Sequence, residues 1–257
     1  MDKEFAKKTL LITGATSGIG KAAALRFAAA GASIAAVGRD EAALSKLKEE
    51  LDSSGVQCLA IRADLSLEEE AELAVSKTAD HFDGIDVLVN AAGHISTGTI
   101  EDTPLEAWDA MLGINLRAPF ILMQKALPSI IARRGNIVNV SSVTGLRAFP
   151  GVLAYCVSKA GLDQLTRCAA LELAAKGVRV NAVNPGVVVT EIHKRGGMTQ
   201  EQYDAFLDHS KATHPLGRVG EAREIAELIF FLASERASWI TGATYSIDGG
   251  RAQTCAR

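Results

Sequence analysis

The chain has 257 residues, of which 48% are hydrophobic and 22% charged, and its formal net charge is -3. This composition is typical of a globular protein, and the near-balanced charge gives no reason to expect nucleic acid or a membrane as partner. The cysteines are scattered without a C-x-x-C pair, so we expect reduced thiols and no metal site at Cys58, Cys156, Cys168 and Cys255. Residues 1–8 are polar, and the apolar run after them is too short for a signal sequence. The sequence therefore favours a cytoplasmic protein.

The first predicted strand leads directly into a glycine-rich turn. Residues 9–13 are apolar and β-branched, as in a buried strand, and the turn Thr13-Gly14-Ala15-Thr16-Ser17-Gly18-Ile19-Gly20 follows at once. A helical pattern then continues to about residue 31. Glycines allow the backbone to approach a pyrophosphate, and the amides at a helix N-terminus bind it. Strand, turn and helix in this order predict a dinucleotide-binding site.

The end of the second predicted strand indicates the cofactor. This strand covers residues 33–37, and Gly38, Arg39 and Asp40 follow it. Proteins that bind NAD usually have an acidic residue here, which binds the ribose 2′-hydroxyl. Gly38 lacks that carboxylate, and the guanidinium of Arg39 matches the 2′-phosphate of NADP. We therefore expect NADP(H) to be preferred, while Asp40, or an Arg39 that is only a solvated loop charge, keeps NAD(H) open.

Helix and strand patterns alternate through the middle of the chain. Helices are expected at 41–51, 67–81 and 104–131, and strands at 57–63 and 85–89. Asp64-Leu65 ends the third strand. Asn90-Ala91-Ala92-Gly93 ends the fourth, and its small residues permit a flat ligand to approach closely. Asn115 lies among apolar residues of the long helical stretch, so we expect it to point inward and to need a partner.

Ser142, Tyr155 and Lys159 are the strongest candidates for catalysis. Tyr155 and Lys159 are four residues apart, so they share one face of a helix expected to run to about residue 176. A nearby ammonium favours the phenolate and lowers the pKa of a tyrosine. Ser142 follows the strand expected at 136–141, whose end can bring its hydroxyl beside the tyrosine. The three groups suit proton transfer to or from a carbonyl or alcohol oxygen.

The segment 187–217 interrupts the alternation. It follows Asn184-Pro185-Gly186 and contains one short predicted helix, at 199–210. Long excursions of this kind usually form a lid or a binding loop. Its basic run His193-Lys194-Arg195, with Arg147 near the same rim, would favour an anionic substrate unless these are solvated loop charges.

Seven strands alternating with helices predict one doubly wound α/β domain of the Rossmann type over residues 1–257. The last elements are a strand at 178–183, a helix at 223–233 and a strand at 243–247. We expect a seven-stranded parallel sheet with helices on both faces and the ligand at the carboxyl ends of the strands. The glycine-rich turn, Asn90, Ser142 and Pro185-Gly186 all follow such ends, so they should converge at one edge.

In their order and spacing, these motifs resemble the short-chain dehydrogenase/reductase family over essentially the whole chain. The matching residues are Thr13-Gly14 with Gly18-Ile19-Gly20, Asp64, Asn90-Ala91-Ala92-Gly93, Asn115, Ser142, Tyr155 with Lys159, Pro185-Gly186 with Thr190, and Asp248-Gly249-Gly250. One departure is Ala91, where the family more often has a second asparagine. Asn90 and Gly93 remain, so this change puts little in doubt.

The resemblance implies a role for each matching residue. Tyr155 would be the acid/base, Ser142 would bind the substrate oxygen, and Lys159 would bind the nicotinamide ribose and lower the tyrosine pKa. Asn115 would hold a water that links Lys159 to solvent. The expected cofactor contacts are Gly14, Thr16, Ser17, Gly18, Ile19, Gly20, Arg39, Asp64, Leu65, Asn90, Ala91, Gly93, Tyr155, Lys159, Pro185, Gly186, Val188 and Thr190. Family members are usually homotetramers, sometimes dimers, built on the two long helices and the last strand.

The substrate stays open at this level. The residues and the resemblance favour an NADP(H)-dependent enzyme that interconverts a carbonyl and a secondary alcohol. Within the family the chain is most like 3-oxoacyl-carrier-protein reductases, and Arg133 and Lys176 fall where those enzymes dock an acyl carrier protein. Alternatives are an NAD-dependent alcohol or steroid dehydrogenase and a catalytically silent NADP-binding regulator. A silent regulator would be expected to lose one of the three catalytic candidates, and all three are present.

Overall fold

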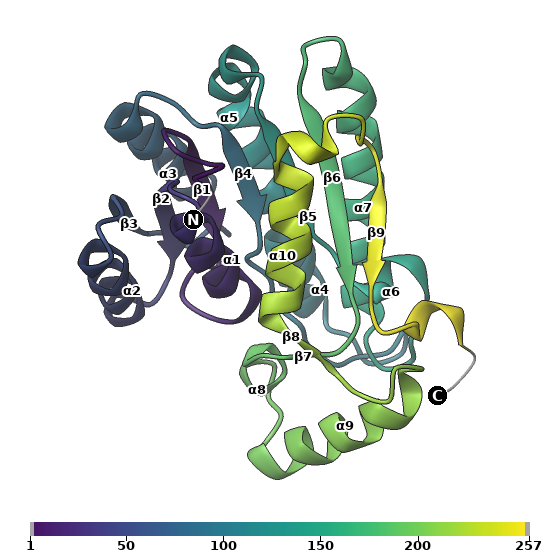
Figure 1. Ribbon diagram of the computed structural model, residues 1–257. Helices are drawn as coiled ribbons and strands as arrows, with labels where there is room; N and C mark the ends of the chain where they lie inside the picture. Colours follow the sequence, from purple (N-terminus) through teal and green to yellow (C-terminus); the bar gives the residue numbers. More distant parts are fainter. Residues whose placement is uncertain (1–2, 255–257) are drawn as a thin grey trace.

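The computed structural model describes residues 3–254, and Cys255 lies outside them. Its centre is a seven-stranded parallel sheet, as the sequence predicted (Figure 1). The strand order, which was not predicted, is β3-β2-β1-β4-β5-β6-β9. Strands β1 to β3 extend the sheet in one direction, and β4 to β9 extend it in the other. The order of the strands therefore reverses between β1 and β4, and such folds bind their ligands at this point. The strands are β1 (Thr9–Thr13), β2 (Ser33–Gly38), β3 (Cys58–Arg62), β4 (Val87–Asn90), β5 (Asn136–Val140), β6 (Arg179–Pro185) and β9 (Thr244–Ile247).

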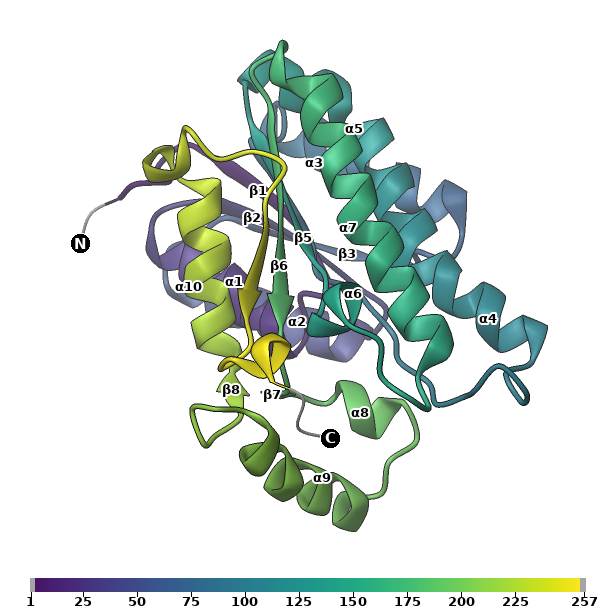
Figure 2. The ribbon, with the colours of Figure 1, turned by 90° about the vertical axis from the view of Figure 1, so that its right-hand side faces the viewer.

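Helices cover both faces of this sheet (Figure 2). One face packs against α1 (Gly18–Ala29), α2 (Glu41–Ser53) and α10 (Ala222–Ala233). The other packs against α3 (Glu68–Phe82), α5 (Ala118–Arg133) and α7 (Leu153–Ala174). Because both faces are covered, the strands are almost continuously apolar, which is why their positions could be predicted from the sequence.

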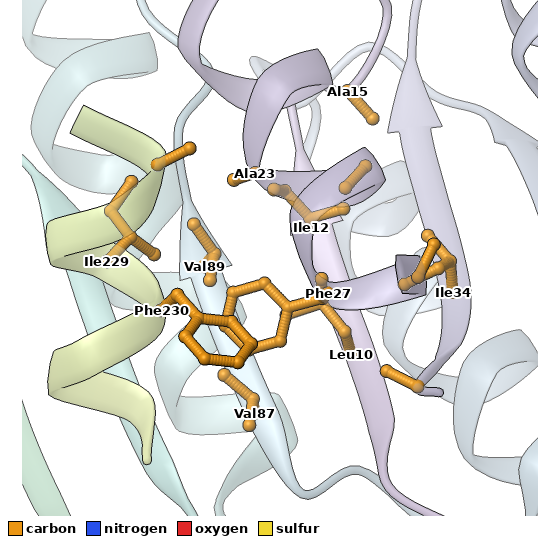
Figure 3. Close-up of a cluster of buried hydrophobic side chains, with 14 of the residues drawn as sticks. Leu10, Ile12, Ala15, Ala23, Phe27, Ile34, Val87, Val89, Ile229 and Phe230 are labelled. Atoms are coloured by element: carbon orange, nitrogen blue, oxygen red, sulfur yellow. The ribbon is translucent and has the colours of Figure 1, made fainter. Parts of the chain in front are cut away.

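A cluster of aromatic side chains joins α1 and α10 to the sheet (Figure 3). Phe27 from α1 and Phe230 from α10 have ring centres 5.2 Å apart, and at most 1% of either side chain is exposed. Figure 3 shows their rings between Val89 and Val87 of β4. The guanidinium of Arg26 covers the outer side of the Phe230 ring at 3.5 Å from its centre. This packing, in the last turn of α1, fixes against the sheet the helix that follows the glycine-rich turn.

The structure corrects the prediction of one helix over 104–131. That stretch consists of α4 (Leu105–Leu112), a π-helical turn (Gly113–Arg117) and then α5. Several short elements were also not predicted, because tertiary contacts rather than a repeating apolar pattern determine them. They are α6 (Val143–Leu146), α8 (Ile192–Arg195), β7 (Val188–Val189) and β8 (Gly220–Glu221). The predicted short helix in the excursion is α9 (Gln200–Thr213), and Figure 1 shows α8 and α9 beyond the carboxyl ends of the strands.

Three further observations apply to residues 3–254. No helix among them is long and apolar enough to cross a membrane. They contain no group of three or more His, Cys, Asp and Glu side chains placed to hold a metal ion. Cys58, Cys156 and Cys168 are free thiols.

Candidate active site

A large cavity lies at the carboxyl ends of the strands. Its volume is about 1380 Å³, which exceeds the ~300–1000 Å³ of most small-ligand pockets. The glycine-rich turn, the segments that follow β2 to β6, the first turns of α7 and parts of the 187–217 excursion line it. The cavity therefore has room for a dinucleotide together with a substrate.

The glycine-rich turn forms one wall in a conformation that requires glycine. Gly14 has a φ of 65°, and a Cβ there would lie 2.9 Å from the carbonyl oxygen of Ala91. A Cβ at Gly20 would collide with the carbonyl oxygen of Gly14. Thr13 fixes the turn to the end of β4, because its Oγ1 accepts hydrogen bonds of 3.0 Å from the N–H groups of Ala91 and Ala92. The turn and the N-terminus of α1 thus form a cradle that fits the phosphates of a dinucleotide.

The end of β2 presents Arg39 to the cavity. Its side chain is exposed and lines the cavity, whereas Gly38 packs so closely on Thr16 that a Cβ would lie 2.8 Å from the Thr16 Cγ2. Asp40 also borders the cavity, but its carboxylate caps α2 by accepting a hydrogen bond of 3.0 Å from the N–H of Ala43. The acidic residue that the sequence left open as a ribose ligand is therefore engaged in a helix cap.

Tyr155 and Ser142 meet in the cavity wall. Tyr155 lies in the first turn of α7, and Ser142 is the N-cap of α6, directly after β5. Each is only 8% exposed, and the Ser142 side chain acts to lower the Tyr155 pKa against the larger effect of burial. The Ser142 Oγ also accepts a hydrogen bond of 3.1 Å from the N–H of Thr144, which fixes its position. Burial raises the pKa of Tyr155 to about 12, so the hydroxyl is protonated at neutral pH.

Lys159 lies one turn after Tyr155, as the spacing predicted. Its ammonium donates a hydrogen bond of 2.8 Å to the carbonyl oxygen of Val140 and lies 5.6 Å from the centre of the Tyr155 ring. Burial lowers the pKa of Lys159 to about 8, and the charge of Asp163 opposes this shift. The expected lowering of the Tyr155 pKa by Lys159 is not found in this structure. Desolvation of the phenol dominates there, and the ammonium is bound to Val140.

Asn115 lies behind the cavity wall, in the π-helical turn between α4 and α5. It is fully buried, and its amide is paired with the backbone of His94. The Oδ1 accepts a hydrogen bond of 2.9 Å from the His94 N–H, and the Nδ2 donates one of 2.8 Å to the His94 carbonyl oxygen. The Nδ2 also donates to the Ser158 Oγ at 3.1 Å, and that hydroxyl donates to the Tyr155 carbonyl oxygen at 2.8 Å. The prediction that Asn115 points inward and has a partner is confirmed.

The 187–217 excursion crosses the mouth of the cavity. At its start, the Tyr203 hydroxyl of α9 accepts a hydrogen bond of 3.1 Å from the N–H of Thr190 and donates one of 2.9 Å to the Thr190 carbonyl oxygen. From α8, the guanidinium of Arg195 donates a hydrogen bond of 3.0 Å to the Ser17 Oγ in the glycine-rich turn. Hydrogen bonds thus hold the excursion to its own first residues, at Thr190, and to the glycine-rich turn across the cavity, at Ser17.

The basic residues expected at the rim do not form one anion site. The Arg147 guanidinium donates hydrogen bonds of 2.6 Å to the carbonyl oxygens of Ala252 and Thr254, so it holds the C-terminal segment. His193 packs on Phe206 with ring centres 4.6 Å apart, and burial lowers its pKa, which favours the neutral imidazole. Arg147 and His193 therefore do not support the expectation of an anionic substrate.

Comparison with known proteins identifies the family. A family model described as enoyl-(acyl carrier protein) reductase matches residues 14–252. A short-chain dehydrogenase/reductase of unknown function from Caenorhabditis elegans, solved with cofactor, superposes with a TM-score of 0.92 at 36% identity, covering 98% of this chain and 97% of that chain. The chain belongs to the short-chain dehydrogenase/reductase family. It is therefore an oxidoreductase.

Two curated relatives of this dehydrogenase/reductase have different names. The 3-oxoacyl-(acyl-carrier-protein) reductase of Thermotoga maritima is 38% identical over 95% of this chain and 97% of its own length. The glucose 1-dehydrogenase of Gluconobacter oxydans is also 38% identical, over 96% of this chain and 92% of its own length. Membership of the family therefore does not determine the substrate, and the residues that line the cavity must indicate it.

Nearly all predicted cofactor residues line the cavity. They are Gly14, Thr16, Ser17, Gly18, Ile19, Gly20, Arg39, Asp64, Leu65, Ala91, Gly93, Tyr155, Lys159, Pro185, Gly186, Val188 and Thr190. The side chain of Asn90 is not part of this lining, because it is 2% exposed and its Nδ2 donates a hydrogen bond of 2.8 Å to the Oδ1 of Asn139 on the neighbouring strand. The amide of Asn90 therefore joins two strands, and the cavity wall begins at the next residue, Ala91.

The structure places Arg133 and Lys176 away from this chain's own cavity. Arg117, at the start of α5, lines the cavity, whereas Arg133 ends that helix 16 residues later, about 24 Å away along its axis. There Arg133 pairs with Asp83, which precedes β4. Lys176 follows the end of α7, whose first turns line the cavity. Both basic residues thus lie at the edge of the sheet opposite this chain's own cavity.

Sequence reasoning missed two groups of residues at the site. One is an apolar lining of Ile95, Phe149, Met198 and Phe206, which comes from separate loops and helices and leaves no common pattern in the sequence. The other is the buried carboxyl group of Asp163, one turn after Lys159. Its spacing of four from Lys159 was a signal in the sequence, although such pairs are usually exposed.

Proposed function

We propose that this protein is an NADP(H)-dependent oxidoreductase that interconverts a carbonyl and a secondary alcohol, with Tyr155 as the acid/base. One observation carries the proposal. Tyr155 and Ser142 line the same cavity as a glycine cradle suited to a dinucleotide. The whole chain would act as one catalytic domain, with the 187–217 excursion as its lid.

In the proposed reduction, the bound nicotinamide supplies the hydride. The chain's own residues bind and polarise the substrate oxygen. Ser142 donates a hydrogen bond to it, while Tyr155, protonated because burial raises its pKa, gives its proton to the developing alkoxide. The ammonium of protonated Lys159, 5.6 Å from the centre of the Tyr155 ring, would stabilise the phenolate that remains, an effect smaller than the desolvation that raises the Tyr155 pKa. Asn115 positions these groups through His94 and Ser158, which links it to the backbone of Tyr155.

The proposed preference for NADP(H) rests on the end of β2. Arg39 brings a fixed positive charge to the cavity, and its planar donors match the oxygens of a phosphate. The acid that could repel this phosphate, Asp40, is held by the N–H of Ala43. A dinucleotide bound at the glycine cradle would place its adenine ribose near this strand end.

For the substrate, we favour a 3-oxoacyl thioester over a sugar. The cavity walls include Ile95, Phe149, Met198 and Phe206, and such side chains suit an acyl chain better than a polyol. A relative named 3-oxoacyl-(acyl-carrier-protein) reductase supports this choice, and the glucose 1-dehydrogenase name is the competing one. A carrier protein docked at Arg133 and Lys176 would need the cavity of another copy of the chain.

The proposal includes assembly into a homotetramer. Large apolar side chains are exposed near the last strand and on the long helices, among them Trp239 at 98% and Leu171 at 82%. Contiguous patches of exposed apolar side chains often mark an interface between proteins. The measured mass of the protein in solution tests the tetramer, and a concentration-independent monomer would contradict it.

A panel of substrates tests the proposed function. Turnover is measured with NADPH and with NADH on a soluble acetoacetyl thioester and on butanedione, and with the oxidised cofactors on glucose. We expect the fastest turnover with the thioester and NADPH. Faster glucose oxidation would favour the sugar dehydrogenase, and cofactor binding without turnover of any carbonyl would contradict the proposed reaction.

A further inference from the structure

The carboxyl group of Asp163 is buried beside the catalytic groups but touches neither cofactor cradle nor cavity. Its side chain lies on α7, one turn after Lys159, and only 1% of the residue is exposed. A buried carboxyl group costs free energy unless donors or opposite charges compensate for it. The compensation at Asp163 is partial. Its Oδ2 accepts a hydrogen bond of 2.8 Å from the Nδ2 of Asn184, whereas its Oδ1 is buried without a hydrogen-bond partner among the described residues, and burial raises the pKa of the carboxyl group.

This carboxyl group is connected to the loop that carries Ser142. The Nδ2 of Asn184 that binds Asp163 also donates a hydrogen bond of 2.9 Å to the Ser142 carbonyl oxygen. On the other side, a Cβ at Gly145 in α6 would collide with the Asp163 Oδ2, so the helix capped by Ser142 rests directly on the carboxyl group. Asp163 therefore supports the position of Ser142 from two sides.

The same carboxyl group acts on Lys159. Its charge raises the pKa of Lys159 against the effect of burial. The other charged side chain that acts on Asp163 is Arg167, one turn further along α7. Of the neighbouring elements, β5 and α6 carry no charged residue, and β6 carries only Arg179, whose guanidinium donates to the carbonyl oxygens of Leu232 and Ser234. Asp163 is thus the acid that balances the buried ammonium.

We propose that Asp163 is a positioning residue for the reaction. Through Asn184, its carboxylate fixes the position of Ser142 beside Tyr155. Its negative charge favours the protonated form of Lys159. The inference rests on the proposed function, in which Ser142 and protonated Lys159 act on the substrate oxygen and the phenolate.

The first test removes the negative charge of Asp163 while keeping the shape of its side chain. Asp163→Asn retains an acceptor for Asn184, and Asp163→Ser is a smaller second variant. Lysine-selective NMR titration of the cofactor-free protein should show the pKa of Lys159 falling by about one unit in both variants. The matched control is Asp86→Asn, another buried acid, which binds Lys8 and the Thr9 N–H at the far edge of the sheet. An unchanged Lys159 pKa in the Asp163 variants, or an equal shift in the control, would overturn the electrostatic role.

The second test separates positioning from charge. Asn184→Ala should lower kcat for the acetoacetyl thioester about tenfold, with the Kd for NADPH within about twofold of wild type and a smaller fall of the Lys159 pKa than in Asp163→Asn. Asp163→Asn should lower kcat/KM and move its alkaline limb to lower pH, because a lost negative charge makes Lys159 release its proton sooner. Wild-type kinetics in either variant would refute this inference while the proposed function stands. An inactive wild-type protein would instead refute the proposed function, and the NMR titration would still decide the charge of Asp163.

Discussion

Replacing Arg39 with alanine should remove most of the preference for NADPH. In the structure, Arg39 is the exposed basic residue at the end of β2, and Asp40 beside it is engaged as the cap of α2. Charge-assisted hydrogen bonds contribute about 1.5–3 kcal/mol, and solvent around the exposed guanidinium places this one at the lower end. A loss of about 1.5 kcal/mol corresponds to about a tenfold loss of affinity for NADPH. Binding of NADH should change little, because it has no 2′-phosphate.

The assay compares kcat/KM for NADPH and NADH in wild type and in Arg39→Ala. The matched control is Arg62→Ala, since Arg62 ends the adjacent strand in register with Gly38, is also exposed, and does not line the cavity. We expect the discrimination to fall about tenfold in Arg39→Ala, chiefly through a higher KM for NADPH, and to stay unchanged in the control. A wild type that prefers NADH, or an Arg39→Ala variant with unchanged discrimination, would refute the reasoning.

Three further predictions follow from the site. The pKa of Lys159, lowered to about 8, predicts that kcat/KM for reduction is level below about pH 8 and falls above it, because the active form is protonated; a profile flat through this range would contradict that role. Hydrogen exchange across residues 187–217 should slow when NADPH binds, because the excursion would close on the cofactor, whereas equal rates would count against a lid. Reversing the charges of Arg133 and Lys176 should leave turnover of the soluble thioester within about twofold, since both lie far from this chain's cavity. If the same variant loses turnover only with a carrier-bound thioester, the carrier protein docks at Arg133 and Lys176 and its substrate enters the cavity of another copy of the chain.

The sheet and its covering helices could be predicted because their signals are local. A parallel strand buried on both faces is a short apolar run, and a covering helix repeats its apolar positions every three to four residues. Residues that follow strand ends must meet at one edge, so the convergence of the glycine-rich turn, Ser142 and Tyr155 on one cavity was accessible from the sequence. The rules for parallel crossovers reduce the number of possible strand orders but do not select the observed one.

Other features depend on contacts that no local pattern encodes. The π-helical turn at Asn115 forms where its amide meets the backbone of His94, which is 21 residues away. The inward direction of Asn90 depends on Asn139 of the next strand, and its position at a strand end suggested a ligand contact instead. The direction of the Tyr155 pKa shift depends on burial, which spacing from Lys159 does not reveal. Each of these is a tertiary effect on a residue whose type was correctly noticed.

The most direct test of the central claim is the turnover of Tyr155→Phe. The substitution removes one hydroxyl from a side chain that is 8% exposed and leaves its ring to pack as before. The account predicts a loss of about 10²–10⁴-fold in kcat for the acetoacetyl thioester with NADPH, while the Kd for NADPH stays within about twofold. Turnover within a few-fold of wild type would show that Tyr155 is not the proton donor.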